Sequence, residues 1–171
     1  MPELFLDDCD FIIKGETEDV CMHIRDGWVP KGIIESKPIA DLDSLAFPRW
    51  DIFPIKEYSY FPAMREKPFL PVLSSRGCSY TCNYCPYKVS YSFRERTANN
   101  VLEEIGYLIK KFNVKGLLFR DPLFSLNRKR VEEIALKIIK KGYKIMWACE
   151  TRPDLLDEDL LDVFYKAGLR V

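Results

Sequence analysis

The sequence FLPVLSSRGCSYTCNYC, residues 69–85, joins a short apolar run to a cluster of three cysteines. Its first part predicts a β-strand over residues 69–74 that leads into a loop. Gly77 gives this loop conformational freedom just before the first cysteine. Three thiolates with the spacing CxxxCxxC can hold three corners of a cubane iron–sulfur cluster and leave the fourth iron without a protein ligand. An iron left open in this way is a site for chemistry, so we expect the function to lie here.

After this loop, β-rich runs alternate with amphipathic helical patterns. The pattern predicts strands over residues 115–120 and 144–149, the start of a fourth strand at 169–171, and helices over 100–112, from Asn127 to Gly142, and over 157–167. Asn100, with Glu103 three residues later, is a typical helix start. Such alternation indicates successive βα units around a parallel sheet.

The first third of the chain has a different character. Residues 11–14 predict a short strand and residues 16–25 a helix. Seven of the eleven prolines then lie between Pro30 and Pro71, both included. A proline density of this kind indicates an extended connector on a neighbouring surface.

The composition excludes several classes of protein. The chain has 171 residues, with 26 Lys and Arg against 26 Asp and Glu. It therefore lacks the excess of positive charge that a nucleic-acid-binding protein usually carries. No apolar run approaches the roughly 20 residues that span a bilayer, and the acidic start MPELFLDDCD is unlike a secretory signal. We therefore expect a cytoplasmic protein without a membrane span, whose cysteines are thiols or metal ligands.

Other interpretations of the cysteines remain open at this point. The three could form a zinc site whose fourth ligand is Cys9, Cys21, His23 or Cys149, although zinc sites usually present two separated cysteine pairs. A ferredoxin-type carrier needs a fourth cysteine in a C-x₂-C-x₂-C-x₃-C run, which the sequence lacks. Outside the cluster, Cys149 fits a small core residue better than a ligand.

The motif and its surroundings resemble radical S-adenosylmethionine (SAM) enzymes, with Tyr84 just before the last cysteine. The segments KGLLFRDPLF (115–124), WACETR (147–152) and KAG (166–168) are similar to strand motifs of the subgroup that carries a cobalamin-binding domain. Upstream, IKGETE (13–18) and DLDSLAFP (41–48) resemble the end of that domain and its linker. One departure is clear: the D-x-H-x-x-G motif of the cobalamin domain is missing, because the single histidine, His23, does not fit it.

The resemblance implies an α/β fold that is part of a longer enzyme. Residues 69–171 would be the first three to four βα units of a partial (β/α) barrel, since a complete one takes about 250 residues. Residues 31–68 would be a proline-rich linker, and residues 1–30 a remnant of a Rossmann-like cobalamin domain. A truncated product without activity is the remaining alternative.

The resemblance also assigns ligands. Cys78, Cys82 and Cys85 would bind a [4Fe-4S] cluster whose free iron is chelated by SAM, and the backbone of Tyr84 would contact the adenine. The SAM amino, ribose or carboxylate groups would face three side chains at strand ends, namely Asp121, Glu150 and Arg152. Other roles fit these three residues as well. Asp121 suits a turn that accepts backbone hydrogen bonds before Pro122, and Glu150 with Arg152 suits a structural ion pair.

The activity that the resemblance implies is the reductive cleavage of SAM to methionine and a 5′-deoxyadenosyl radical. It requires an electron donor such as a flavodoxin or ferredoxin and an absence of oxygen. In the full-length parent, cobalamin would support methyl transfer or a rearrangement of a small-molecule substrate, which the sequence does not specify.

The basic run Arg128 to Arg130 lies at a predicted helix end, and we expect its side chains to be solvated.

Overall fold

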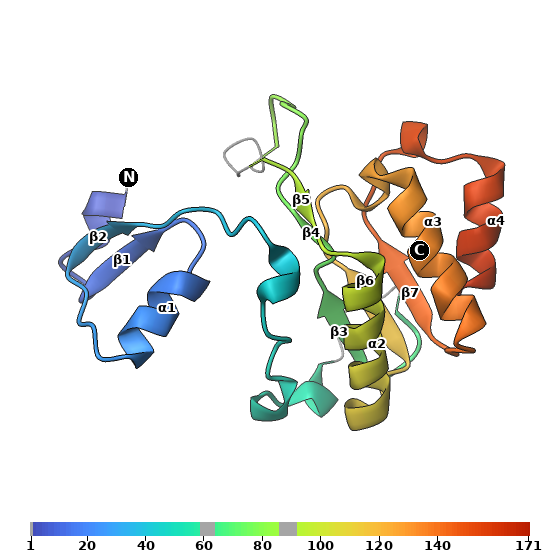
Figure 1. The fold of residues 1–171 in the computed structure, drawn as a ribbon, viewed down its shortest axis with the longest axis horizontal. Helices are drawn as coiled ribbons and strands as arrows, with labels where there is room; N and C mark the ends of the chain where they lie inside the picture. Colours follow the sequence, from blue (N-terminus) through green and yellow to red (C-terminus); the bar gives the residue numbers. More distant parts are fainter. Residues whose placement is uncertain (1, 59–63, 86–91) are drawn as a thin grey trace. The chain divides into compact units, whose positions relative to one another are not determined.

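The computed structural model describes residues 2–58, 64–85 and 92–171 (Figure 1). It divides into two compact units, Met1–Ala40 and Asp41–Val171. In the described residues, no helix has both the length and the apolar character to cross a bilayer.

The first unit is a βαβ arrangement. The short 3-10 helix η1 (Pro2–Phe5) comes first. Strands β1 (Phe11–Lys14) and β2 (Gly32–Glu35) then pair in parallel, and α1 (Glu18–Arg25) connects them. The strand and helix expected at the start of the chain are confirmed. Strand β2 was not expected, because its four residues lie between Pro30 and Pro38 and the proline density hides them. The first unit thus continues to Ala40, past the boundary at residue 30.

The second unit contains a three-stranded parallel sheet. Its strands are β3 (Phe69–Val72), β6 (Gly116–Phe119) and β7 (Met146–Cys149), hydrogen-bonded in the order β3-β6-β7. They alternate along the chain with α2 (Ala98–Phe112), α3 (Arg128–Lys140) and α4 (Glu158–Lys166). The predicted βα alternation is confirmed. A fourth strand begins as expected, because Leu169 bridges in parallel to Trp147 and the Arg170 amide donates to the Trp147 carbonyl at 3.0 Å.

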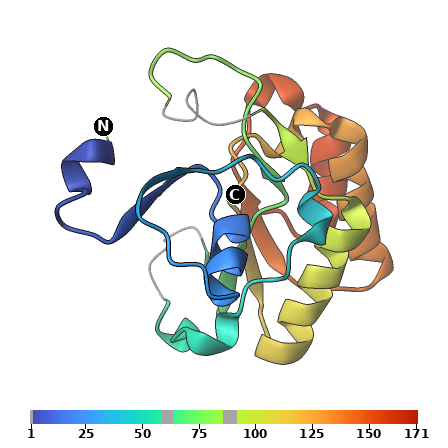
Figure 2. The same cartoon turned by 60° about the vertical axis from the view of Figure 1, so that its left-hand side comes forward.

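The three helices pack against one face of this sheet (Figures 1 and 2). At the centre of the packing, the Phe119 and Phe124 rings lie 4.6 Å apart and the Trp147 and Phe164 rings 5.2 Å apart. The Trp147 indole N–H donates to the Ala167 carbonyl at 3.0 Å, so the buried ring keeps a partner for its only polar atom. On the other face, a smaller apolar cluster contains Met64, Phe69, Leu118 and Ala148.

The helices of the second unit begin at capping side chains. Asn127 and Asp157 accept backbone hydrogen bonds from Arg130 and Leu160, as their sequence positions suggest. The predicted start of α2 at Asn100 is wrong, because Thr97 is the N-cap and its hydroxyl accepts from the Asn100 amide at 3.2 Å.

The segment before β3 lies against this core. Over residues 41–58 it contains three 3-10 helices, η2 (Leu42–Ser44), η3 (Trp50–Ile52) and η4 (Ile55–Glu57). Trp50, Ile55 and Tyr58 pack on the core, and the Asp43 carboxylate accepts from the Thr97 amide at 2.9 Å and from its hydroxyl at 2.6 Å. The segment is therefore anchored at the start of α2.

Gly168 is the position where the turn into the fourth strand is most constrained. Its φ is +106°, and a Cβ there would lie 2.0 Å from the Ile145 carbonyl oxygen. We expect Gly168→Ala to lower the free energy of unfolding by about 2–4 kcal/mol, because backbone strain and a steric clash add. Gly142→Ala is the matched control, with a φ of +65° and open space around its Cβ, and should lose only about 1–2 kcal/mol. Urea unfolding followed by circular dichroism measures both, and equal losses would contradict this packing.

Candidate functional site

The cysteine loop leaves and rejoins the domain on a short two-stranded stem. Strand β4 (Ser75–Arg76) pairs antiparallel with β5 (Arg94–Glu95), and the Arg96 amide donates to the Ser74 carbonyl at 3.0 Å. We call β4, β5 and these two flanking residues the loop stem. The stem follows directly on the carboxyl end of β3 (Figure 1). Gly77, with a φ of +78°, turns the chain from β4 toward the first cysteine.

The three cysteines are half-buried and carry free thiols. The Cys85 amide donates to the Cys82 carbonyl at 3.2 Å, which makes a turn between the second and third cysteine. In the part of the chain that the structure describes, no three Cys, His, Asp or Glu side chains gather closely enough to hold a metal ion. Three thiols on one short segment are nevertheless the donor set that an iron–sulfur cluster uses. The residues fit this group in their chemistry.

Asp121 joins the end of β6 to the beginning of the stem. It is fully buried, and its carboxylate accepts from the Ser74 amide at 3.2 Å and from the hydroxyls of Ser74, at 2.8 Å, and Ser75. Burial raises the pKa of this carboxyl, and the hydrogen bonds from the serines oppose the rise. Asp121 thus acts as a hydrogen-bond acceptor, with partners across the sheet at Ser74 and Ser75. Its predicted contact with SAM stays a prediction.

Sequence reasoning missed Arg130, which lies in the first turn of α3. The expectation that it belongs to a solvated basic run is wrong, because only 6% of its side chain is exposed. Its Nε lies 3.0 Å from Glu95 Oε2, at ion-pair distance but without the alignment of a hydrogen bond. Glu95 also accepts from the Asn127 amide group at 2.6 Å. No local signal separates Arg130 from Arg128 and Lys129, because all three follow the same helix cap.

Glu150 and Arg152 follow β7 and do not pair with each other. Glu150 pairs with Arg120, whereas Arg152 makes two hydrogen bonds of 2.9 Å to Asp154. The Arg152 guanidinium also lies over the Tyr80 ring, 4.3 Å from its centroid. The hydrogen bonds to Asp154 raise the pKa of Arg152. Arg152 therefore connects the end of the third strand to the cysteine loop.

The remaining candidate residues are Tyr84, Cys149 and three side chains of the first unit. The Tyr84 side chain is 91% exposed, and its backbone contact to adenine stays a prediction. Cys149 packs against the core, and burial raises its pKa to about 12, which suits the expected core residue. Cys9 and Cys21 are exposed in the first unit, where His23 meets Trp28 edge to face at 6.4 Å.

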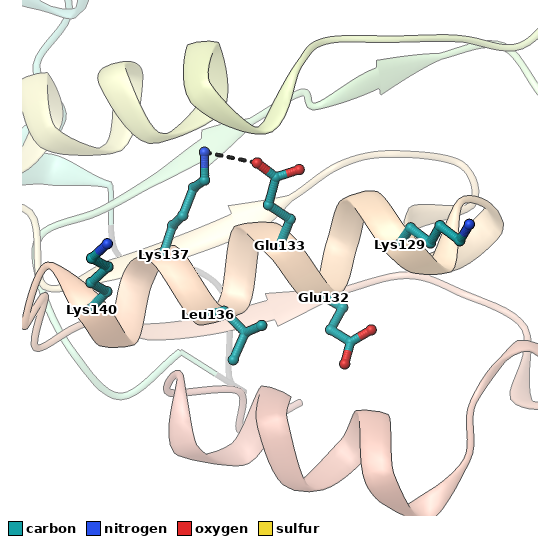
Figure 3. A pocket seen from close by; sticks show the side chains of 6 residues that line it. All are labelled: Lys129, Glu132, Glu133, Leu136, Lys137 and Lys140. Atoms are coloured by element: carbon teal, nitrogen blue, oxygen red, sulfur yellow. Dashed lines mark ion pairs between the residues drawn. The ribbon is translucent and has the colours of Figure 1, made fainter.

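A surface hollow on α3 is not part of the site. Six side chains of this one helix line it: Lys129, Glu132, Glu133, Leu136, Lys137 and Lys140 (Figure 3). Glu133 and Lys137 form an ion pair of 2.8 Å. None of the six belongs to the cysteine loop, to its stem or to a strand end, so the hollow is a solvated helix face.

Comparison with known proteins identifies the family. Residues 72–171, which include the stem and all three cysteines, match the radical SAM superfamily. The chain belongs to this superfamily. Its members are enzymes that use a [4Fe-4S] cluster and SAM, so the zinc site weighed from the sequence is not favoured.

Two curated relatives cover most of the chain. An uncharacterized methyltransferase of Pyrococcus horikoshii is 27% identical over 190 residues, which cover 98% of this chain and 40% of the relative. An anaerobic magnesium-protoporphyrin IX monomethyl ester cyclase of Rubrivivax gelatinosus is 36% identical over 135 residues, which cover 77% of this chain and 24% of the relative. The chain thus spans less than half the length of these proteins.

Solved structures show the same fold. The radical SAM methyltransferase TsrM of Kitasatospora setae, with tryptophan substrate and a SAM analogue bound, matches with a TM-score of 0.54 and 20% identity. The match covers 60% of this chain and 20% of TsrM. A second structure of TsrM, with cobalamin and a [4Fe-4S] cluster bound, gives a TM-score of 0.53.

The bonds of Asp121 to the stem lead to a prediction about stability. Asp121→Ala leaves an amide and two hydroxyls buried without their acceptor, so we expect a loss of about 2–4 kcal/mol in the free energy of unfolding. Asp154→Ala, which removes an exposed partner of Arg152, should cost less than about 1 kcal/mol. Urea unfolding compares the two variants. An Asp121→Ala variant as stable as the wild type would show that the stem does not depend on this carboxylate.

Proposed function

We propose that residues 69–171 form the first βα units of a radical SAM barrel and that Cys78, Cys82 and Cys85 bind its [4Fe-4S] cluster. One observation carries the proposal: the superfamily match contains the three cysteines and coincides with a parallel sheet whose first strand runs directly into their loop. Sites in parallel barrels collect at the carboxyl ends of the strands. The stem, Asp121, Glu150 and Arg152 all lie at such ends.

The bound cluster would supply one electron, taken from a reductant such as a flavodoxin or ferredoxin, to break the C5′–S bond of SAM and yield methionine and a 5′-deoxyadenosyl radical. The role of this chain is to bind and orient. Three thiolates leave one iron for the amino and carboxylate groups of SAM. The Arg152 guanidinium lies over the Tyr80 ring, 4.3 Å from its centroid, and so connects the end of β7 to the cysteine loop.

The SAM contacts follow from the same edge of the sheet. Glu150 and Arg152 are about half exposed, and their present partners, Arg120 and Asp154, are surface side chains whose ion pairs exchange readily with other partners. We propose that Glu150 and Arg152 bind polar groups of SAM and that the backbone of Tyr84 contacts the adenine. Asp121 is buried and bonded to Ser74 of the stem, which favours a supporting role without direct contact to SAM.

The parent enzyme would be a cobalamin-dependent methyltransferase or rearrangement enzyme acting on a small molecule without oxygen. Two relatives, named as a methyltransferase and as an anaerobic cyclase, support this outcome. For the first unit, the βαβ arrangement of β1, α1 and β2 supports the remnant of a Rossmann-like cobalamin domain, followed by a linker into the barrel. TsrM, a structural neighbour, holds cobalamin together with its cluster.

The iron content of a serine variant tests the proposal. After anaerobic reconstitution with iron and sulfide, the wild-type chain should hold about four irons. Cys82→Ser should lose most of this iron, because a serine hydroxyl is a poor substitute for a thiolate. Cys21→Ser, at an exposed cysteine of the first unit, is the matched control and should load like the wild type.

The same samples report SAM cleavage. With a reductant and SAM, the wild-type chain should release 5′-deoxyadenosine and Cys82→Ser should not. Unchanged iron loading in Cys82→Ser, or a colourless wild-type protein with one zinc, would contradict the assignment of the three cysteines.

A further inference from the structure

Arg130 reaches from α3 to the base of the cysteine loop. The Asn127 side chain caps this helix and accepts from the Arg130 amide at 3.3 Å, which places Arg130 in the first helical turn. From there its side chain runs inward and is nearly fully buried. Burying a guanidinium costs free energy unless its N–H groups find acceptors. The contacts of Arg130 therefore indicate its structural role.

These contacts reach the two residues that flank the stem, one before β4 and one after β5. One terminal nitrogen, Nη1, donates to the Ser74 carbonyl and hydroxyl at 3.2 Å each and to the Arg96 carbonyl at 3.3 Å. The other, Nη2, donates to the Ser74 hydroxyl at 3.3 Å. Ser74 enters the stem and Arg96 leaves it, so one planar group holds together two segments between which the whole cysteine loop lies.

The charges around Arg130 complete this arrangement. Glu95, on the outgoing strand of the stem, lies at ion-pair distance, and Asp121 accepts hydrogen bonds from the same Ser74 that Arg130 contacts. The Arg96 side chain pairs with the buried Glu104 of α2. A lysine at position 130 would keep the charge but lose the fork of donors that contacts both ends at once.

We propose that Arg130 is a positioning residue that closes the stem of the cysteine loop and thereby fixes where the three thiols stand relative to the strand ends. This inference deepens the proposed function and rests on it. Arg130 touches neither cysteine nor ligand in this role; it acts through Ser74, Glu95 and Arg96.

Amide hydrogen exchange measured by NMR on the full chain tests the stem without any cluster. We expect Arg130→Lys to speed exchange of the Ser74 and Arg96 amides about tenfold, because local opening of the stem becomes easier. Amides of α2 and β6 should change much less. Arg128→Lys is the matched control, since Arg128 lies in the same turn and pairs with Asp157 at the surface; its stem amides should exchange as in the wild type.

Glu95→Gln gives a second route if Arg130→Lys does not fold. The glutamine keeps an acceptor for Asn127 but removes the charge beside Arg130, so stem exchange should accelerate in the same direction and to a smaller extent. Equal acceleration in the stem, α2 and β6 would make Arg130 a general stability residue and overturn the proposal. Stem amides that exchange at the wild-type rate in both variants would overturn it as well.

A spectroscopic readout links the stem to the thiols. After reconstitution, Arg130→Lys should bind less iron than Arg128→Lys, and its reduced cluster should give a broadened electron paramagnetic resonance (EPR) signal because the loop samples more conformations. Wild-type loading and an unchanged line shape in Arg130→Lys would contradict the positioning role. A wild-type chain that takes up no cluster would count against the proposed function alone, since the exchange experiment still decides on the stem.

Discussion

A buried arginine and a buried aspartate meet at Ser74, and the placement of the cysteine loop depends on that meeting. Asp121 fixes the incoming strand of the stem, and Arg130 ties the incoming and outgoing strands together. Both side chains are buried, and in such a place a lost partner leaves an unpaired polar group, which costs several kcal/mol. The stem therefore depends on buried interactions that few substitutions would preserve. The three thiols of the loop are only half-buried.

Local patterns predicted the elements of the second unit well, because each helix repeats an apolar stripe against one sheet face. Val101, Ile105 and Leu108 of α2 are fully buried, as their spacing requires. The errors arose where short signals competed. Asn100 and Thr97 are both good caps, and tertiary contact with Asp43 favours Thr97. Strand β2 is only four residues long between two prolines, so its pairing with β1 decides its conformation.

The cysteine motif could be read from the sequence, but the structure around it could not. The spacing of the three cysteines predicts their chemistry without any tertiary information. Ser74, the shared partner of Arg130 and Asp121, lies 56 and 47 residues away from them along the chain, and nothing local distinguishes a buried arginine from its neighbours in a basic run. Glu150 and Arg152 are close in sequence and were expected to suit an ion pair, yet each pairs with another residue: Glu150 with Arg120, and Arg152 with Asp154.

The proposed chemistry requires one iron that the three thiolates leave without a protein ligand, so that SAM can bind it. EPR spectroscopy of the reduced, reconstituted chain, recorded with and without SAM, tests this most directly. The account predicts that SAM changes the g values of the cluster signal, because its amino and carboxylate groups bind the open iron. A [4Fe-4S] signal that stays the same at saturating SAM would mean that every iron is already capped, and the assignment would be wrong.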